Sequence, residues 1–515
     1  QLPTWRDSAA IVARALEGQG RLQEALREVV ACFPVYRSYV SANGWTDLDE
    51  HAVDSAVSEA LGRNPAVEPS IFQFIRSVLL PSRSDGGSDV GRRLLFAMKF
   101  QQYTGPVQAK GVEDTAFYRY APLVSLNEVG GNPARFGRSP AEFHEANRRR
   151  LAGWPFAMIA TATHDTKRGE DARARLNVIS EIPGQWRVAV SRWARANTSA
   201  RSLVRGRPAP DRNDEYLFYQ TLVGAWPAGL KERPDAVFVG RIRDYMLKAV
   251  KEAKVHTSWV SPFEDYNRAV ARFVERALAG SNARTFVPLF VQFHERIARL
   301  GMVNSLAQVV LKIASPGVPD FYQGTELWDL SLVDPDNRGS VDFSLRSAWL
   351  QALEHLLDPH VPVGERVASL TDMLQRWEDG RIKLYVTAAG LRARRSFRDV
   401  FLQGAYEPLA SQGARAGHVL AFARTLGDRQ IVAVAPRLVA GLCGFAATLP
   451  SGSATWGDTR IVLGEGAPAR FTNLLTGGHV ESRAADGCVV ISVADALETV
   501  PATLLVRGGT EDALR

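Results

Sequence analysis

A histidine and a carboxylate follow directly on an apolar segment in the stretch ATATHDTKRGEDARARL, which spans residues 160–176. The segment from Pro155 to Ile159 predicts a buried strand, and His164 and Asp165 lie just beyond it. Such a pair could form a structural hydrogen bond at the strand end, or it could act on a substrate. Four cations follow in the sequence: Lys167, Arg168, Arg173 and Arg175. They are predicted to surround Asp165 and to favour its charged form.

Two other chemistries are not indicated by this stretch. A zinc site would need a second histidine at ligand spacing or a His-Glu-x-x-His helix, and neither pattern occurs. A serine hydrolase would need a Gly-x-Ser-x-Gly elbow, which the sequence also lacks. The sequence therefore predicts no metal at this position.

A second polar cluster lies in AKGVEDTAFYRY, residues 109–120. One interpretation is the start of a charged helix, where acidic residues in the first turn are favoured. The other is a cradle for a sugar, in which polar groups hydrogen-bond hydroxyls and aromatic rings stack on apolar ring faces. A phosphate site would instead use Gly-rich backbone and few acids. The candidate residues of this cluster are Lys110, Glu113, Asp114 and Tyr118.

A third cluster occupies PGVPDFYQGTELWDLSLVDPDNRGSVDF, residues 316–343. Turn chemistry explains its Pro and Gly residues but not the number of aromatic and acidic side chains in one loop. The DPDN segment has some likeness to a calcium loop, but the EF-hand spacing with its terminal Glu is missing. The candidate residues here are Tyr322, Glu326, Asp336 and Arg338.

Strands must position the first and third clusters. Two apolar stretches, FAMIATATHD at 156–165 and IASPGVPDFYQGTE at 313–326, each run into a polar loop. In a (β/α) barrel the catalytic groups lie where the strands end, so such loops are where they are expected. The segment FVPLFVQFHERIARLGMVNSLAQVVLKIAS predicts a long helix before the second stretch, and NDEYLFYQTLVGAW predicts another, capped by Asn213 or Asp214.

The remaining sequence changes character along its length. Helical periodicity continues to about Lys99, and residues 100–136 are predicted to be rich in turns. From about Gly417 the apolar period becomes two, in short segments such as HVLAFART and RQIVAVA. This pattern predicts a small antiparallel β-domain. The apolar run from Ile431 to Pro450 is interrupted by Pro436-Arg437, so it predicts two buried strands and no membrane span.

Composition limits the function classes. The chain has 515 residues, of which 46% are hydrophobic and 23% charged, and this indicates a soluble globular protein of two or three domains. The net charge of +7 comes from interspersed residues without a basic block, which argues against a nucleic-acid partner. Three distant cysteines and a start without a signal-peptide core predict a cytoplasmic location.

The clusters also carry a family resemblance. THDTKRGEDARARL and PGVPDFYQGTEL resemble the seventh- and eighth-strand regions of the α-amylase superfamily. A longer segment, FQQYTGPVQAKGVEDTAFYRYAPLVSLNEVGGNPARFG, is more specific. Together with LVGAWP, DPDNRGSVDF and FTNLLTG, it resembles the maltooligosyltrehalose synthases, or (1→4)-α-D-glucan 1-α-D-glucosylmutases, over essentially the whole chain.

This resemblance implies the C-terminal part of a (β/α)8 TIM barrel with large helical insertions, followed by an antiparallel β-domain. The chain begins without Met and has no Gly-x-Arg-x-Asp pattern ahead of Ala160, so the N-terminal barrel half is expected to be missing. The implied parts are a helical insertion at 1–99, barrel strands and loops at 100–184, a second insertion at 185–285, the last barrel helix and strand with following helices at 286–416, and the β-domain at 417–515.

The resemblance further implies a retaining two-carboxylate mechanism that turns the reducing-end α-1,4 bond of a malto-oligosaccharide into an α,α-1,1 bond. Asp165 matches the carboxylate that stabilises the transition state, and His164 assists it. The nucleophile and the general acid are expected upstream of the chain. Lys167 and Arg168 are implied as further substrate contacts, together with the candidate residues of the second and third clusters.

No cofactor is implied. The implied partners are the glucan substrate, the missing barrel half and a trehalohydrolase that acts on the product. Two alternatives remain open from the sequence. The chain could serve another α-amylase-type hydrolase or transferase, or it could be an inactive sugar-binding fragment.

Overall fold

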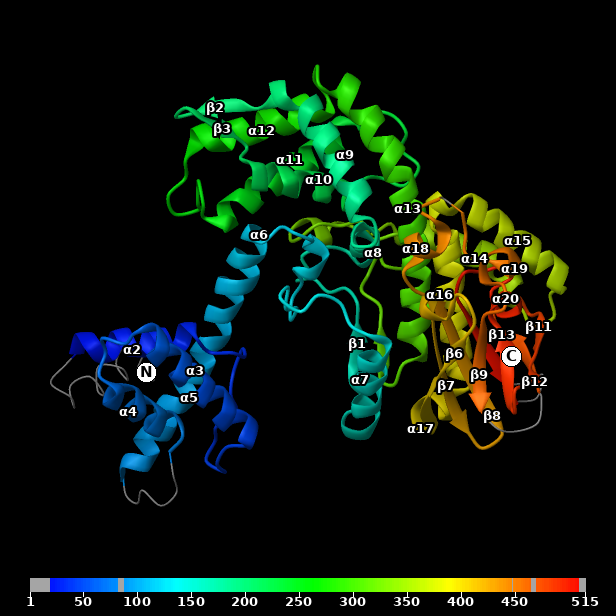
Figure 1. Cartoon of the computed structure of the whole chain (residues 1–515), viewed down its shortest axis with the longest axis horizontal. Coiled ribbons are helices and arrows are strands. Elements are labelled where there is room, and N and C mark those ends of the chain that lie inside the picture. Colours follow the sequence, from blue (N-terminus) through cyan, green and yellow to red (C-terminus); the bar gives the residue numbers. More distant parts are fainter. Residues whose placement is uncertain (1–18, 82–87, 447, 465–468, 509–515) are drawn as a thin grey trace. The chain divides into compact units, whose positions relative to one another are not determined.

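The computed structural model describes residues 19–81, 88–446, 448–464 and 469–508. The chain divides into two compact units. The first comprises the described residues up to Arg119 together with Glu252–Lys254, and the second comprises the rest. Figure 1 colours the first unit blue to cyan along the sequence.

The first unit is helical, as its apolar periodicity predicts. The first four helices in its described part are α2 (Gln19–Ala31), α3 (Asp47–Arg63), α4 (Pro69–Leu79) and α5 (Ser88–Gln108). A capping box of Thr46 and Asp49 starts α3. Aromatic residues such as Phe33, Phe72 and Phe100 fill the core between these helices.

The predicted turn-rich texture from Phe100 onward is wrong for the first part of that range. The chain stays helical through the end of α5, then through a π-helix, η1 (Ala109–Ala116), and α6 (Phe117–Arg119). Pro106 lies inside α5 and has no N–H to donate. A wider π-type turn follows it and keeps the segment helical.

In the second unit the two predicted strand stretches pair with each other. Strands β1 (Met158–Ala160) and β4 (Val318–Asp320) are parallel, with Met158 opposite Val318 and Ala160 opposite Asp320. Gly317 adopts a φ of +117°, and a Cβ there would lie 2.7 Å from the Ala157 oxygen, so the turn into β4 requires glycine. The two polar loops therefore leave neighbouring strands at the same edge.

Strand β1 is not buried as predicted, because Met158 is 69% exposed. Nearby, Trp154 and Phe156 are 76% and 66% exposed. Within the described residues, β1 has a strand partner on one side only.

Most of the described part between η1 and β4 is helical. The helices after α6 are α7 (Pro140–Gly153), α8 (Glu170–Ile179), α9 (Pro183–Ala196), α10 (Arg212–Ala225), α11 (Ala236–Ala253), α12 (Glu264–Leu278) and α13 (Ala283–Ala314). Short elements between them are η2 (Val124–Leu126), η3 (Thr198–Ala200), β2 (Ser202–Val204) and β3 (Arg207–Ala209). The cap of α10 is Asp211 rather than Asn213 or Asp214, because Asp211 has the extended backbone of an N-cap and accepts from the Asp214 N–H.

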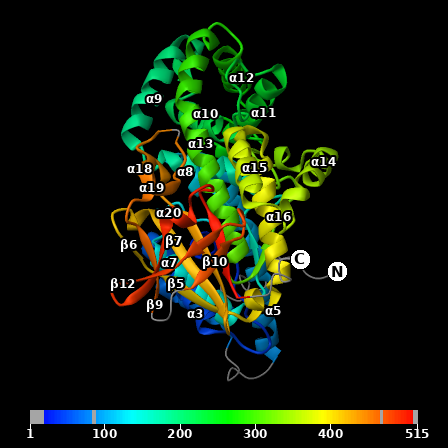
Figure 2. The ribbon, with the colours of Figure 1, turned by 90° about the vertical axis from the view of Figure 1, so that its right-hand side faces the viewer.

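The predicted long helix is confirmed as α13, the central helix of this unit. It packs against α8, against α16 (Arg381–Ser396) and against the β-domain, as Figures 1 and 2 show. It is the one helix in the described part that is long and apolar enough to cross a membrane. Of its most apolar window, 78% is buried inside the protein.

Further helices follow β4. They are η4 (Asp336–Arg338), α14 (Phe343–Leu353), η5 (His355–Leu357), α15 (Val363–Gln375), η6 (Trp377–Asp379), α16 and α17 (Arg398–Gln403). Helix α16 lies against α13 and carries Lys383, a fully buried lysine.

The C-terminal part consists of two antiparallel sheets. One sheet has the order β11-β10-β14-β8-β7-β5 and the other β12-β13-β9-β6. The strands are β5 (Ala405–Leu409), β6 (Ser411–Gln412), β7 (Val419–Leu426), β8 (Arg429–Pro436), β9 (Arg460–Gly464), β10 (Arg470–Asn473), β11 (His479–Glu481), β12 (Arg483–Ala485), β13 (Cys488–Ser492) and β14 (Thr503–Arg507). The first strand begins at Ala405, ahead of the predicted start of the β-domain at 417.

The second of the two strands predicted between Ile431 and Pro450 is wrong. After β8 the chain forms a short helix, α18 (Val439–Cys443), because Leu438 and Gly444 on either side adopt left-handed conformations that turn the backbone. Two further short helices, α19 (Gly452–Trp456) and α20 (Val493–Ala496), belong to this part.

Candidate functional site

The loop that carries His164 and Asp165 leaves the carboxyl end of β1 as a tight turn. The Asp165 N–H donates to Thr163 Oγ1 at 3.2 Å, and Thr166 Oγ1 donates to the Thr163 oxygen at 2.8 Å. These bonds fix the loop backbone, and the side chains of His164 and Asp165 are exposed. The pair is therefore open to a ligand.

The cations do not surround Asp165 as predicted. Within the described residues the Asp165 carboxylate forms no ion pair, and Lys167 and Arg168 are 5% and 4% exposed. The Arg168 guanidinium donates to the Tyr245 hydroxyl at 2.7 Å. Arg173 donates to the Thr161 oxygen. Arg168 and Arg173 therefore bind the parts of the protein that support the loop.

Glu128 fixes the base of the same loop. One of its oxygens accepts from the Lys167 N–H at 2.8 Å, and the other accepts from the Arg168 N–H at 3.3 Å. Arg173 lies 3.7 Å from this carboxylate. Glu128 was not predicted as a site residue, although it lies in the motif NEVGG that contributed to the family resemblance.

A buried ion network lies under both loops. The Lys383 ammonium on α16 contacts Glu170 at 2.6 Å and Asp171 at 2.7 Å, and none of the three side chains is more than 3% exposed. Lys312 on α13 lies 3.6 Å from Glu170. It also donates to Thr161 Oγ1 at 2.7 Å, just after β1, and to the Asp320 oxygen at 3.0 Å, at the end of β4.

Burial and charge set the protonation of this network. Burial opposes the charge on Glu170, but the lysines outweigh it and lower the pKa of Glu170 to about 2. Burial raises the pKa of Asp171. Burial also lowers the pKa of Lys312, whereas the two carboxylates raise the pKa of Lys383 despite its burial. Glu170 and Lys383 are thus charged in the folded protein.

Asn337 joins the third cluster to the first. Its side-chain N–H groups donate to the His164 and Thr166 oxygens, both at 3.1 Å. The Tyr322 hydroxyl in turn donates to the backbone oxygen of Asn337 at 3.2 Å. The structure therefore brings these two predicted clusters together.

The backbones of the two loops also contact each other directly at Gly169. The Gly169 N–H donates to the Ser331 oxygen at 2.8 Å. A Cβ at Gly169 would lie 2.5 Å from the Asp329 oxygen, so no larger residue fits without movement.

Three of the predicted residues in the third cluster are engaged in ion pairs. Arg241 contacts both oxygens of Asp336 at 2.7 Å, and one of these oxygens also accepts from the Leu332 N–H at 2.7 Å. Arg346 contacts Glu326 at 3.0 Å, and Arg338 contacts Asp334 at 2.8 Å. In this geometry Asp336 and Glu326 shape the loop, and a substrate would have to compete with their arginines.

The second cluster belongs to the first unit. The π-helix η1 carries Lys110, Glu113 and Asp114, and Lys110 contacts Asp114 at 2.5 Å. Glu113 is 4% exposed and accepts a hydrogen bond from the hydroxyl of Tyr36, which was not predicted as a site residue. Tyr118 follows in α6 and is 5% exposed. The segment is neither a helix start nor an open loop, and π-turns are frequent at functional sites.

One group among the described residues brings three metal-ligand atoms within 4.8 Å of one another: Asp211, Asp214 and His256. His256 contacts Asp211 at 2.7 Å, and the Tyr266 hydroxyl donates to Asp214 at 2.5 Å. Burial and the neighbouring Asp211 raise the pKa of Asp214 to about 6. Hydrogen bonds with His256 and Tyr266 therefore already engage the two carboxylates.

Comparisons with known proteins agree with the resemblance of the motifs. A curated protein of Mycobacterium tuberculosis (strain ATCC 25618 / H37Rv), named "Putative maltooligosyl trehalose synthase", is 40% identical over 338 residues, which is 66% of this chain and 38% of that protein. A solved maltooligosyltrehalose synthase from Arthrobacter ramosus matches 98% of this chain and 56% of its own, with 34% identity and a TM-score of 0.76. A hypothetical maltooligosyl trehalose synthase from Sulfolobus tokodaii matches with 28% identity and a TM-score of 0.64, over 94% of this chain and 53% of its own. No family model matches the chain.

The chain shares the amylase-type fold of these solved structures, with mixed helices and sheets. More particularly, the homologues to which it is similar are named maltooligosyltrehalose synthases. It spans 38% of the length of its curated relatives and 53–58% of that of its solved ones. This partial coverage agrees with the predicted resemblance to the C-terminal part of such a protein.

Proposed function

We propose that this chain contributes one wall of the active site of an intramolecular transglucosylase. The enzyme would convert the reducing-end α-1,4 bond of a malto-oligosaccharide into the α,α-1,1 bond of trehalose, in the biosynthesis of trehalose from glucan. The observation that carries the proposal is the pairing of β1 with β4, because it brings the His164–Asp165 loop and the Asn337 loop together at one edge.

The chemistry of this edge suits a sugar. Asp165 offers carboxylate oxygens and His164 a ring nitrogen, and both are exposed while their backbone is fixed from below. Hydrogen bonds from such a rigid pair to the hydroxyls of a distorted sugar ring would strengthen in the transition state and lower the barrier. In this proposal Asp165 stabilises the transition state, and His164 orients the same ring.

The other two carboxylates of a retaining mechanism must come from elsewhere. Retention needs a nucleophile and an acid about 5–5.5 Å apart, one ionised and one protonated. Glu170 and Asp171 are not suitable, since Lys383 contacts both and they are almost completely buried. We therefore propose that the nucleophile and the acid lie in a barrel half that this chain does not contain.

The exposure of strand β1 supports the proposal that a further segment covers it. Parallel strands are normally buried on both faces. Strand β1 has one partner in the described part of the chain, and Trp154, Phe156 and Met158 are exposed around it. The remaining strands of a (β/α)8 barrel would cover this surface. A cytoplasmic location, and a trehalohydrolase that acts on the product, remain proposals that follow from the family.

The second cluster is also proposed to serve the reaction. Lys110, Glu113, Asp114 and Tyr118 are proposed to hold the released sugar while it turns and to keep water away, because water would divert transfer into hydrolysis. The buried Glu113, which accepts from Tyr36, would fix this segment, and the exposed Lys110 would make such contacts.

Asp165→Asn in the complete polypeptide tests the proposal. Turnover of maltopentaose should fall by about 10³-fold, since a charged transition-state contact is lost, while the unfolding midpoint in urea stays unchanged. The matched control is Asp428→Asn, an exposed aspartate in the β7–β8 turn, which should leave both values as they are. Turnover of Asp165→Asn within about three-fold of the wild type would remove Asp165 from the mechanism.

A further inference from the structure

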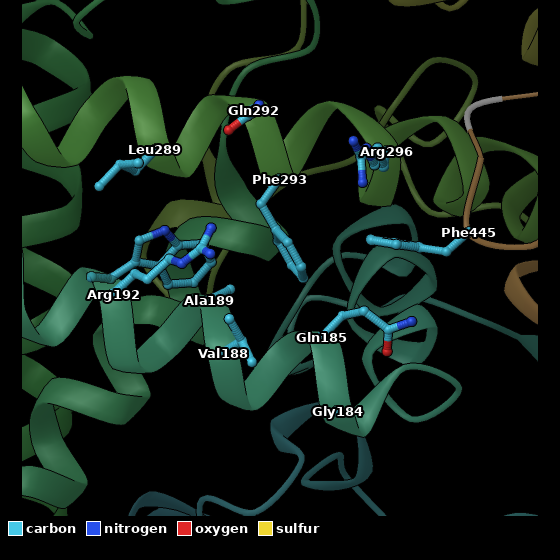
Figure 3. A pocket seen from close by; sticks show the side chains of 11 residues that line it. Gly184, Gln185, Val188, Ala189, Arg192, Leu289, Gln292, Phe293, Arg296 and Phe445 are labelled. Carbon is cyan, nitrogen blue, oxygen red and sulfur yellow. The ribbon is translucent and has the colours of Figure 1, made fainter.

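A groove of about 530 Å³ lies between α9 and the first half of α13, away from the loops of the candidate site. Along α13, Arg296 in the groove and Lys312 at the strand ends are separated by about 24 Å of helix. Figure 3 shows the groove with its labelled side chains. Its size is in the range of sites for small organic ligands.

Each helix contributes a stripe of residues at helical spacing. Gln185, Val188 and Arg192 come from α9, and Leu289, Phe293 and Arg296 come from α13. The two helices run in opposite directions along the groove, so the arginines lie at opposite ends of it (Figure 3). The middle between them is apolar.

Aromatic rings form the floor and one wall. The Phe293 ring lies 5.5 Å from that of the buried Trp193 and 5.5 Å from that of Phe445, which follows α18. In Figure 3 the Phe293 side chain points into the space between the two helices. The first pair of rings meets edge to face and the second is tilted. Aromatic surfaces of this kind pack well against another aromatic ring, so they favour a flat apolar body over a branched one.

The positive charge of the groove favours an anionic ligand. Arg192 and Arg296 form no ion pair and donate no hydrogen bond within the described residues, although Arg296 lies over the Phe445 ring at 5.7 Å. None of the lining residues is acidic. A sugar site would normally offer carboxylates to the hydroxyls, whereas this groove offers guanidinium groups, whose fork matches carboxylate, sulfonate or phosphate oxygens.

We propose that this groove binds an organic anion with a flat apolar body, whose anionic groups pair with Arg192 and Arg296. Naphthalene disulfonate has this chemistry and serves as the probe, in isothermal titration calorimetry of the full chain. Neutral naphthol has the same ring system without the charge, and maltopentaose represents the glucan.

The wild-type chain should bind the disulfonate, with naphthol at least about ten-fold weaker and with an affinity that falls as salt is added. Arg192→Gln and Arg296→Gln should each weaken the disulfonate about five-fold, the usual worth of one exposed charge pair. Arg195→Gln is the matched control, because Arg195 lies on the same helix, is exposed, and donates to its own helix at Ser191.

Three results would overturn the proposal. The first is no binding of the disulfonate by the wild-type chain. The second is binding without specificity: equal binding of naphthol and disulfonate would make the groove a non-specific apolar surface, and an equal loss in the Arg195 control would make the attraction a general effect of surface charge. The third is maltopentaose binding that competes with the disulfonate and is unaffected by either glutamine variant, which would make it a glucan site.

Discussion

Lys383→Met is the substitution that probes the buried ion network most sharply. In the wild-type protein two lysines and two carboxylates balance each other below the site loops. Methionine fills a similar volume but leaves Glu170 and Asp171 to share Lys312, which lies 3.6 Å from Glu170. Removing one partner from a buried pair costs about 3–5 kcal/mol. This is a large part of the roughly 5–15 kcal/mol that stabilises a typical domain.

The assay is urea unfolding, followed by tryptophan fluorescence. Trp328 is a local reporter, because its ring lies 6.0 Å from the Lys383 ammonium. The matched control is Lys231→Met, which breaks a surface pair at 3.5 Å from Glu295 and should change the unfolding free energy by less than about 1 kcal/mol.

A second substitution and a pH series separate lost charge from lost packing. Asp171→Asn added to Lys383→Met removes the surplus negative charge. The double variant should therefore recover at least about half of the unfolding free energy that Lys383→Met loses. In the wild type the lowered pKa of Glu170 contributes stability above pH 4.5, which is lost as the pH falls toward about 2. Without Lys383, protonation of the buried carboxylates stabilises the folded variant. The difference in unfolding free energy between wild type and variant should therefore narrow as the pH falls toward about 4. A loss below about 1 kcal/mol at neutral pH, or a double variant no better than the single one, would refute this role of the network.

Two further predictions concern glycine packing and a buried carboxylate. Gly169→Ala should lower the unfolding free energy by about 1–3 kcal/mol, because its Cβ would lie 2.5 Å from the Asp329 oxygen. Gly153→Ala is the control and should be nearly neutral, since nothing lies within 4 Å of a Cβ there. Equal effects of the two substitutions in urea unfolding would contradict the close packing at Gly169. Burial raises the pKa of Asp214 from 3.8 to about 6, so folding keeps a proton there and stability falls as the pH rises between these values. Asp214→Asn should flatten this fall in a series of unfolding curves, and an unchanged slope would show that another group is responsible.

The sequence predicted the features that depend on local pattern. The long helix α13 follows from its apolar composition, and the strands of the β-domain follow from a period of two. The two loops that meet at the site were found because each apolar stretch ends in a polar cluster. Patterns of this kind are short in range, and the fold preserves them.

The partners that hold the site were not predictable in the same way. Lys383 contacts Glu170 across 213 residues of sequence, and Asn337 reaches the His164 oxygen across 173. No periodicity connects such positions. The packing of α8, α13 and α16 brings the first pair together, and the pairing of β1 with β4 brings the second pair together. The cations after Asp165 were misplaced for the same reason. Their charge is visible in the sequence, but the directions of the Arg173 and Arg175 side chains depend on which face of α8 is buried, and Lys167 and Arg168 lie in the buried loop before it.

Two local errors have local causes. The segment around η1 contains Pro106, Gly105 and Gly111, which usually indicate turns, yet a π-turn accommodates them within a continuous helix. The apolar run after β8 was interpreted as a strand, but the left-handed Leu438 starts a short helix that packs against α13. Apolar composition alone does not separate these two outcomes.

The most direct test of the proposed function follows maltopentaose with this chain alone and with the complete polypeptide, while reducing ends and free glucose are measured together. We expect no change with the chain alone, and with the complete polypeptide a loss of reducing ends that depends on Asp165 and releases little glucose. Release of new reducing ends by the complete polypeptide would identify a glucan hydrolase instead. Loss of reducing ends with this chain alone would contradict the proposal, because the nucleophile and the acid would then lie within these 515 residues.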